Sequence, residues 1–186
     1  MATRREARTR LDPQVRRQSI LDAAERVVSS RSGNEVTFEA VADEAGVSRA
    51  LVYNYFGDRT GLLVAVEMRT MQRLDAELLD ALDPTLGPAE QLRPLAEAYL
   101  RFARENGRAW RALTSAGITD HPAVQAARAN RVARLAAVWG GTPEALVAAV
   151  TVTRMLEAAS VEWVESEDPD AAVDVVCRIL THGLEG

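Results

Sequence analysis

The sequence predicts an all-α protein of about nine helices, with an N-terminal three-helix unit and a C-terminal helical body. Apolar residues recur at helical spacing through most of the chain, and no stretch shows the sustained alternation of a strand. Turn residues interrupt this pattern at intervals, most clearly in the run from Asp83 to Pro88. Two short helical patterns around Gly46 have the spacing of a helix-turn-helix.

Composition limits the class of protein. A chain of 186 residues suits one compact domain or two small ones. No apolar run reaches the roughly 18–20 residues of a membrane span, and no signal-peptide segment follows the basic N-terminus. The single cysteine, Cys177, excludes an intramolecular disulfide and a cysteine-based zinc motif. We therefore expect a cytoplasmic protein with no membrane partner, no cofactor and no metal.

The net charge of −5 conceals an uneven distribution. The first 20 residues hold two acids, Glu6 and Asp12, against six arginines: Arg4, Arg5, Arg8, Arg10, Arg16 and Arg17. Phosphate contacts dominate affinity for nucleic acid, so this basic arm is consistent with DNA binding. A solubilising tail is the alternative. All 22 basic residues are arginine, which we ascribe to compositional bias.

The first helix is expected from Asp12-Pro13 to about Ser30, because Asp is a favourable N-cap and Pro suits the first helical position. Its apolar stripe consists of Ile20, Ala23, Ala24, Val27 and Val28. This helix should form the scaffold on which the helix-turn-helix packs.

The helix-turn-helix is expected from Thr37–Ala45 and Ser48–Phe56. Gly46 tolerates the positive φ of a tight turn, and Ser48 is a natural N-cap. The second helix buries Leu51, Val52 and Phe56 and leaves its arginine and polar residues outside.

The exposed residues of the second helix indicate DNA binding rather than a pair of amphipathic helices within an ordinary core. A buried helix would not favour Arg49 and Asn54, and a merely solvated helix would not favour Tyr53. Arg49 is the candidate for reading a guanine edge, and Ala50 for touching a thymine methyl. The remaining DNA-binding candidates, mainly phosphate contacts, are Thr37, Ser48, Tyr53, Asn54, Tyr55 and Arg59.

From about Val15 to Leu63 the sequence resembles the TetR-type (tetracycline-repressor-like) transcriptional regulators. The most specific part is Thr37-Phe38-x2-Val41-Ala42-x3-Gly46-Val47-Ser48-Arg49-x3-Tyr53-x-Tyr55-Phe56-x2-Arg59-x2-Leu62-Leu63. Three positions depart from the usual pattern. Phe38 replaces a second Thr, Arg59 replaces a Lys, and Leu51 stands where Thr or Ser is frequent. The rest of the chain resembles the family only in its helical layout.

A fourth helix is expected from near Arg59 to about Leu82, connecting the DNA-binding unit to the body. The body should then hold five more helices, at about 89–105, 108–113, 122–138, 143–165 and 169–182.

The last two helices are apolar over much of their circumference, which indicates burial on several sides. Either they are core helices of a monomer, or they form a four-helix bundle with a second copy. We favour a homodimer, as the resemblance also implies. The expected interface residues are Val147, Val150, Leu156, Val161, Val173, Val176 and Leu180.

The resemblance further implies a pocket for a small-molecule effector, enclosed by the middle helices. Candidate lining residues are Tyr99, Phe102, Trp110, Leu113, Ile118, Met155 and Trp163, with Arg154, Glu157 or Glu162 as polar anchors. Each could equally be ordinary core, and Arg154 with Glu157 could be a surface pair.

An enzyme and a helical interaction adaptor are the rival classes. The two histidines, His121 and His182, belong to no metal-ligand pattern, and no phosphate loop or nucleophile elbow is present. The sequence therefore favours a ligand-responsive DNA-binding regulator that is not an enzyme. Most specifically, we expect a repressor released from a palindromic operator by a small apolar or amphipathic effector. Residues 1–57 would bind DNA, and residues 58–186 would bind the effector and dimerise.

Overall fold

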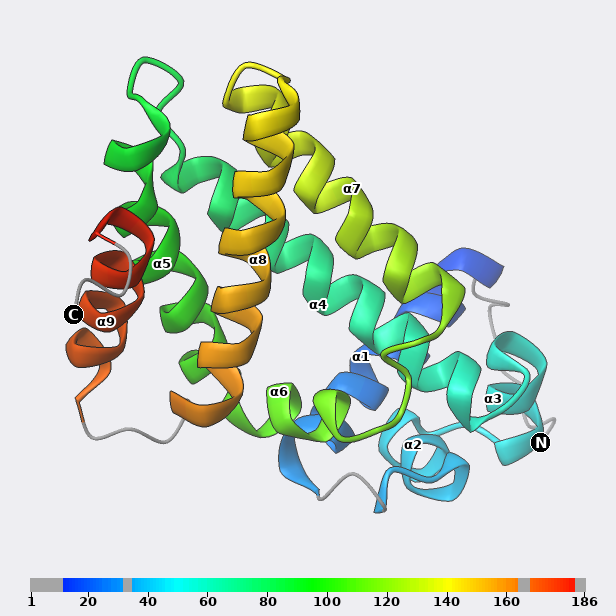
Figure 1. The fold of residues 1–186 in the computed structure, drawn as a ribbon. Helices are drawn as coiled ribbons and strands as arrows, with labels where there is room; N and C mark the ends of the chain where they lie inside the picture. The colour runs from blue at the N-terminus through cyan, green and yellow to red at the C-terminus, as the bar shows by residue number, and fades with distance from the viewer. Residues whose placement is uncertain (1–11, 32–34, 164–167, 183–186) are drawn as a thin grey trace, which may run out of the picture.

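The computed structural model describes residues 12–31, 35–163 and 168–182, and nine α-helices lie within them (Figure 1). The helices are α1 Pro13–Ser30, α2 Phe38–Ala45, α3 Arg49–Phe56, α4 Arg59–Ala81, α5 Pro88–Glu105, α6 Gly107–Thr114, α7 Pro122–Val138, α8 Pro143–Trp163 and α9 Pro169–His182. The predicted all-α fold class is confirmed. We call α1–α3 the head and α4–α9 the body.

Side-chain caps fix where several of these helices begin. Asp12 Oδ1 accepts from the backbone N–H of Gln14 at 2.7 Å and begins α1. Asp58 Oδ1 accepts from the N–H of Gly61 at 2.7 Å and begins α4. Each cap satisfies backbone donors that have no partner within their own helix, so the helix starts follow closely from the sequence.

The head packs around a first cluster of buried residues that extends beyond the head. It joins α1, α2 and α3 to the first half of α4, to α6 and to Val124 at the start of α7. Its centre includes Ile20, Val28, Val41, Val52 and Leu62, all fully buried.

A second cluster holds the body together. It joins the last part of α4, through Leu74 and Leu78, to α5, α7, α8 and α9. Helix α4 therefore contributes to both clusters and runs from α3 across the molecule (Figure 1).

Within the described ranges, no helix is long and apolar enough to cross a membrane. Among the same residues, no group of three or more His, Cys, Asp or Glu side chains is placed to hold a metal ion. Cys177 is a free, buried thiol on α9.

Candidate DNA-binding surface and interior cavity

The turn between α2 and α3 has helix-turn-helix geometry. Gly46 adopts φ 64°, ψ 36°, a left-handed conformation that suits glycine, and ends α2. The next N–H, from Val47, donates to Ala42 O at 2.9 Å. Thr37 and Ser48 cap α2 and α3 by accepting from Ala40 N and Leu51 N, each at 3.2 Å.

Helix α3 presents one polar face to solvent. Val52 and Phe56 are buried, whereas Arg49, Ala50 and Asn54 are exposed. Tyr53 is 60% exposed, and its ring meets that of Phe38 edge-on with centroids 6.3 Å apart. Arg49 forms an exposed ion pair with Glu39 of α2, with N and O 2.9 Å apart. Because both side chains are well exposed, this pair is weak and can exchange for another anion.

The junction between α3 and α4 is tight. Gly57 ends α3 with φ 74°, and a Cβ placed on Gly61 would overlap the carbonyl oxygen of Phe56. Arg59 Nε donates to Val36 O at 3.0 Å, and the Arg17 guanidinium lies 5.1 Å from the Phe56 ring centroid. The first contact ties the start of α4 to the segment before α2, and the second ties α1 to the end of α3.

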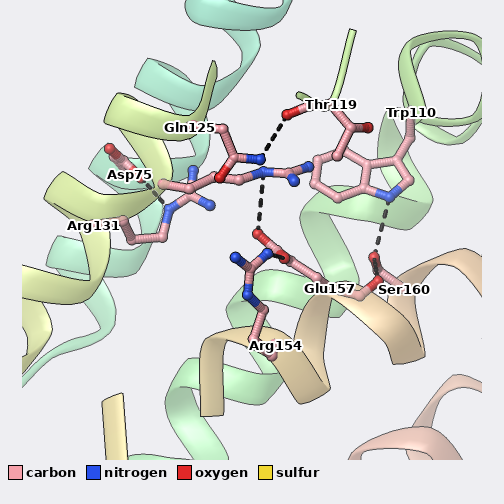
Figure 2. Close-up of polar contacts among 9 residues, drawn as sticks. Asp75, Trp110, Thr119, Gln125, Arg131, Arg154, Glu157 and Ser160 are labelled. Carbon is pink, nitrogen blue, oxygen red and sulfur yellow. Dashed lines mark hydrogen bonds and ion pairs between the residues drawn. The ribbon is translucent and has the colours of Figure 1, made fainter. Parts of the chain in front are cut away.

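A second feature is a cavity of about 220 Å³ inside the body, where α4–α8 meet. In Figure 2, Trp110 of α6, Arg131 of α7 and Glu157 of α8 come together here, and Asp75 of α4 pairs with Arg131. The cavity is lined by Glu67, Met71, Leu74, Tyr99, Trp110, Thr114, Thr119, Arg128, Arg131, Glu157, Ser160 and Val161.

Ion pairs and hydrogen bonds tie the cavity wall to several helices. Arg131 Nε donates to Asp75 of α4 at 2.5 Å, and exposed Arg134 pairs with the same carboxylate. Glu157 lies 2.9 Å from Arg154 and 3.4 Å from Arg128. Trp110 Nε1 donates to Ser160 Oγ at 3.1 Å, which joins α6 to α8.

Burial changes the acid–base properties of this cavity. Desolvation raises the pKa of Glu67, and the charges of Arg128 and Arg131 only partly oppose that effect. Desolvation also raises the pKa of Tyr99. Both shifts favour the neutral forms of these side chains.

Comparison with known proteins identifies the family. Residues 20–66 match the sequence profile of the bacterial regulatory proteins of the tetR family. An uncharacterized HTH-type transcriptional regulator of Mycobacterium tuberculosis is 34% identical over 123 residues, covering 64% of this chain and 59% of that protein. HTH-type transcriptional regulator BetI of Brucella anthropi is 33% identical over 99 residues, covering 52% of this chain and 51% of BetI. The matches thus span between half and three fifths of these curated relatives.

A solved structure matches over the whole length. A TetR-like transcriptional regulator from Rhodococcus sp. RHA1 is 30% identical, with a TM-score of 0.69, covering 95% of this chain and 100% of that one. This chain belongs to the TetR family of transcriptional regulators. The fatty acid degradation regulator FadR of Bacillus halodurans, 18% identical with a TM-score of 0.74, covering 95% of this chain and 99% of FadR, shares the fold. The family accounts for the helix-turn-helix and assigns the chain to regulators, not enzymes.

The predicted DNA-binding residues of this TetR-family regulator lie together around α3. Arg49, Ala50, Tyr53 and Asn54 are exposed on α3 itself, and Tyr55 is half-buried against the first cluster. Thr37, Ser48 and Arg59 lie at helix starts and are exposed. Of the basic arm, Arg16 and Arg17 lie on α1, whereas Arg4, Arg5, Arg8 and Arg10 lie outside the described residues.

Only some of the predicted effector residues line the cavity. Tyr99 and Trp110 do, and Phe102 supports Trp110 edge-on with centroids 6.1 Å apart. Leu113 and Ile118 do not line this cavity and are buried in the first cluster, because α6 packs against α1.

Two other predicted effector residues, Met155 and Arg154, do not line the cavity. Met155 packs against the second cluster, and Arg154 is exposed, reaching the site only through Glu157. The side chain of Trp163 lies outside the described residues, so its role stays a prediction.

The sequence interpretation missed Glu67, Arg128 and Arg131, which supply much of the cavity's charge. A usable sign was present for Arg131. It follows Val124 by seven residues and precedes Leu135 by four, which places a charge on the buried stripe of α7. A buried charge needs a partner, so this position indicates either a structural ion pair or a site.

The predicted dimer residues divide into two groups. Val147, Val150 and Val161 are exposed on α8, and Leu180 is half-buried. Leu156, Val173 and Val176 are each at least 96% buried inside this chain by packing among α5, α8 and α9. They leave almost no surface for a partner.

Proposed function

We propose that this TetR-family regulator is a homodimeric repressor that binds a palindromic operator through α3 and is released by a small effector in its body. The observation that carries the proposal is the outward face of α3, with Arg49, Ala50, Tyr53 and Asn54 exposed on a helix that is fixed at both ends. Such a helix fits the major groove.

In this proposal Arg49 reads a base edge, with guanine as the expected partner, and Ala50 touches a thymine methyl. DNA replaces the exposed Glu39–Arg49 pair, which costs little because solvent already screens it. The residues proposed to contact phosphates and fix the register are Thr37, Ser48, Tyr53, Asn54, Tyr55 and Arg59. Because Arg59 Nε is occupied by Val36 O, its phosphate contact would use the terminal nitrogens.

A second copy would cover the exposed apolar face of α8. Val147 is 67% exposed, Val161 48% and Leu146 47%, which is unusual for three large apolar residues on one helix. A two-fold pairing through this face would set the separation of two α3 helices, as a palindrome requires.

Helix α4 is the proposed connection between effector and operator. We place the functional boundary between Gly57 and Asp58, where α3 ends and the α4 cap begins. Glu67 of α4 lines the cavity, and Asp75 of α4 holds Arg131 of its wall. An effector would shift α4 only if it bound the DNA-incompetent arrangement more tightly.

The test begins by selecting bound fragments from genomic duplex DNA to obtain an operator. Arg49→Ala should then cost about 1–3 kcal/mol on that operator and relax sequence preference, whereas Arg59→Ala should weaken all sequences alike. Affinity is measured against specific and scrambled duplexes over a range of salt concentrations. Arg101→Ala on α5 is the matched control, because it removes the same charge far from α3. Unchanged operator affinity in Arg49→Ala would refute this assignment of the helix face.

A further inference from the structure

The cavity in the body holds more hydrogen-bond donors than its acids engage. Arg131 is 6% exposed, and its Nη2 has no hydrogen-bond partner among the described residues. Arg128 Nε lies 3.4 Å from Glu157 Oε1, but the geometry is not that of a hydrogen bond. Two guanidinium groups on one side of the cavity therefore retain unused donors.

The nearby acids do not engage these unused donors. Asp75 accepts from Arg131 Nε and pairs with Arg134. Glu157 accepts from Arg154 through Oε2 at 2.9 Å, while its Oε1 only faces Arg128 Nε at 3.4 Å. Burial raises the pKa of Glu67, so its ionised form is disfavoured where it would have to balance the arginines. Arg131 Nη2 and Arg128 Nε are thus left with unused donors on largely buried side chains, where an added anion interacts strongly.

We propose that the effector of this regulator is a small amphipathic anion whose carboxylate binds between Arg128 and Arg131. Its apolar part would lie against Met71, Leu74 and Trp110, and the hydroxyls of Thr114 and Thr119 border the same space. The inference rests on the proposed effector response and specifies the chemical class of the ligand.

Size restricts the ligand further. The cavity of about 220 Å³ is smaller than the roughly 300–1,000 Å³ typical of sites for drug-sized ligands. A carboxylic acid with one aromatic ring or a short chain fits that space. A cationic ligand is disfavoured, because it would lie against Arg128 and Arg131 and would leave Arg131 Nη2 without a partner.

The geometry also connects the anion to α4. Arg131 Nε binds Asp75 of α4, so a ligand carboxylate bound at Nη2 of the same guanidinium competes with Asp75 for its charge. Weakening this contact loosens the packing of α7 on α4, the helix that ends in the head.

The proposal is tested on the full chain without DNA by measuring the binding of two small molecules. Each molecule is used as a carboxylate, as its amide and as its amine. The probes are 3-phenylpropanoate and hexanoate with their matched amides and amines, measured by isothermal titration calorimetry. At least one carboxylate should bind about tenfold or more tightly than its own amide and amine, the difference expected for charge-assisted hydrogen bonds. An amine that binds most tightly, equal affinity of carboxylate and amide, or no binding by any probe would overturn the proposal.

Variants of one helix identify the binding group. Arg128→Gln should lower carboxylate affinity about tenfold and leave amide affinity unchanged, whereas Arg128→Lys should keep part of the carboxylate preference. Arg134→Gln on the same helix is the control, because Arg134 does not line this cavity. An equal loss in Arg134→Gln would contradict the assignment. If Arg128→Gln does not fold, Arg128→Lys and the comparison of probes on the unaltered chain still test whether the cavity binds a carboxylate.

Release of a selected operator separates this inference from the proposed function. Carboxylates that bind without releasing DNA would contradict the effector response and leave the anion site standing. Release by an amine or a neutral probe alone would support the response and contradict the anion site.

Discussion

The head and the body of this TetR-family regulator place their charged groups in opposite environments. On α3 of the head the functional residues Arg49 and Tyr53 lie outside, and a largely apolar cluster supports them. In the body, Arg128 and Arg131 face a cavity and are at least 85% buried. The head is therefore built to hold a fixed surface, whereas the body contains charges whose balance a ligand can change. The backbone should be most rigid at the α3–α4 junction. The contact between α4 and α7 should be the part of the structure that responds most to a bound ligand.

The largest effect is expected from the buried pair between α4 and α7. Asp75→Ala should lower the free energy of unfolding by about 3–5 kcal/mol, because Arg131 would keep a buried charge without its carboxylate. Chemical denaturation measures this change. Asp174→Ala is the control, since its pair with Arg93 is similarly short, 2.6 Å against 2.5 Å, but exposed, and should cost less than about 1 kcal/mol. Equal losses of unfolding free energy in the two variants would show that burial does not make the Asp75 pair more important for stability than the exposed Asp174 pair.

An intermediate effect is expected at the junction of head and body. Gly61→Ala should destabilise the protein by about 1–3 kcal/mol and weaken operator binding, because its Cβ would overlap the Phe56 carbonyl oxygen and displace α3. Thermal unfolding and operator titration measure the two consequences. At Gly87, the N-cap of α5, a Cβ meets only the Glu90 side chain at 3.4 Å, so Gly87→Ala should cost under about 1 kcal/mol. Tighter operator binding by Gly61→Ala would show that the junction is not rigid.

The sequence was informative about the head because its determinants are local. Asp12, Ser48 and Asp58 cap helices within three residues of themselves, and Gly46 adopts the positive φ that its turn requires. The cavity was less predictable because its lining comes from five helices whose relative placement depends on tertiary packing. Leu113 and Ile118 illustrate this: the apolar pattern predicts that they are buried, but not in which of the two clusters. The same limit applies to Leu156, Val173 and Val176, whose apolar pattern does not distinguish a dimer surface from the core of one chain.

The smallest effect, and the sharpest comparison of buried with exposed charge, concerns Glu67. Its pKa is raised above 4.5 by desolvation, so the folded protein binds the proton more tightly than the unfolded chain does. Stability attributable to this group is thus fully present below pH 4.5 and is lost as pH rises through the folded pKa. Glu67→Gln should therefore be more stable than the unaltered protein near pH 7, with the difference vanishing towards pH 4. Thermal unfolding across this range, with exposed Glu97→Gln as the control, measures it.

The same variant links that stability term to the ligand. Glu67 is one of two acids that line the cavity, with Glu157, and the charges of Arg128 and Arg131 offset part of its desolvation. Replacing it with neutral Gln should therefore tighten binding of the carboxylate probes near pH 7 and leave their amides unaffected. A Glu67→Gln protein that is less stable at pH 7 would mean that attraction to the arginines outweighs desolvation. In that case the charges of the cavity would balance one another without a ligand. The arginines of the body would then be paired with acids, as Arg49 is paired with Glu39 in the head, despite their greater burial.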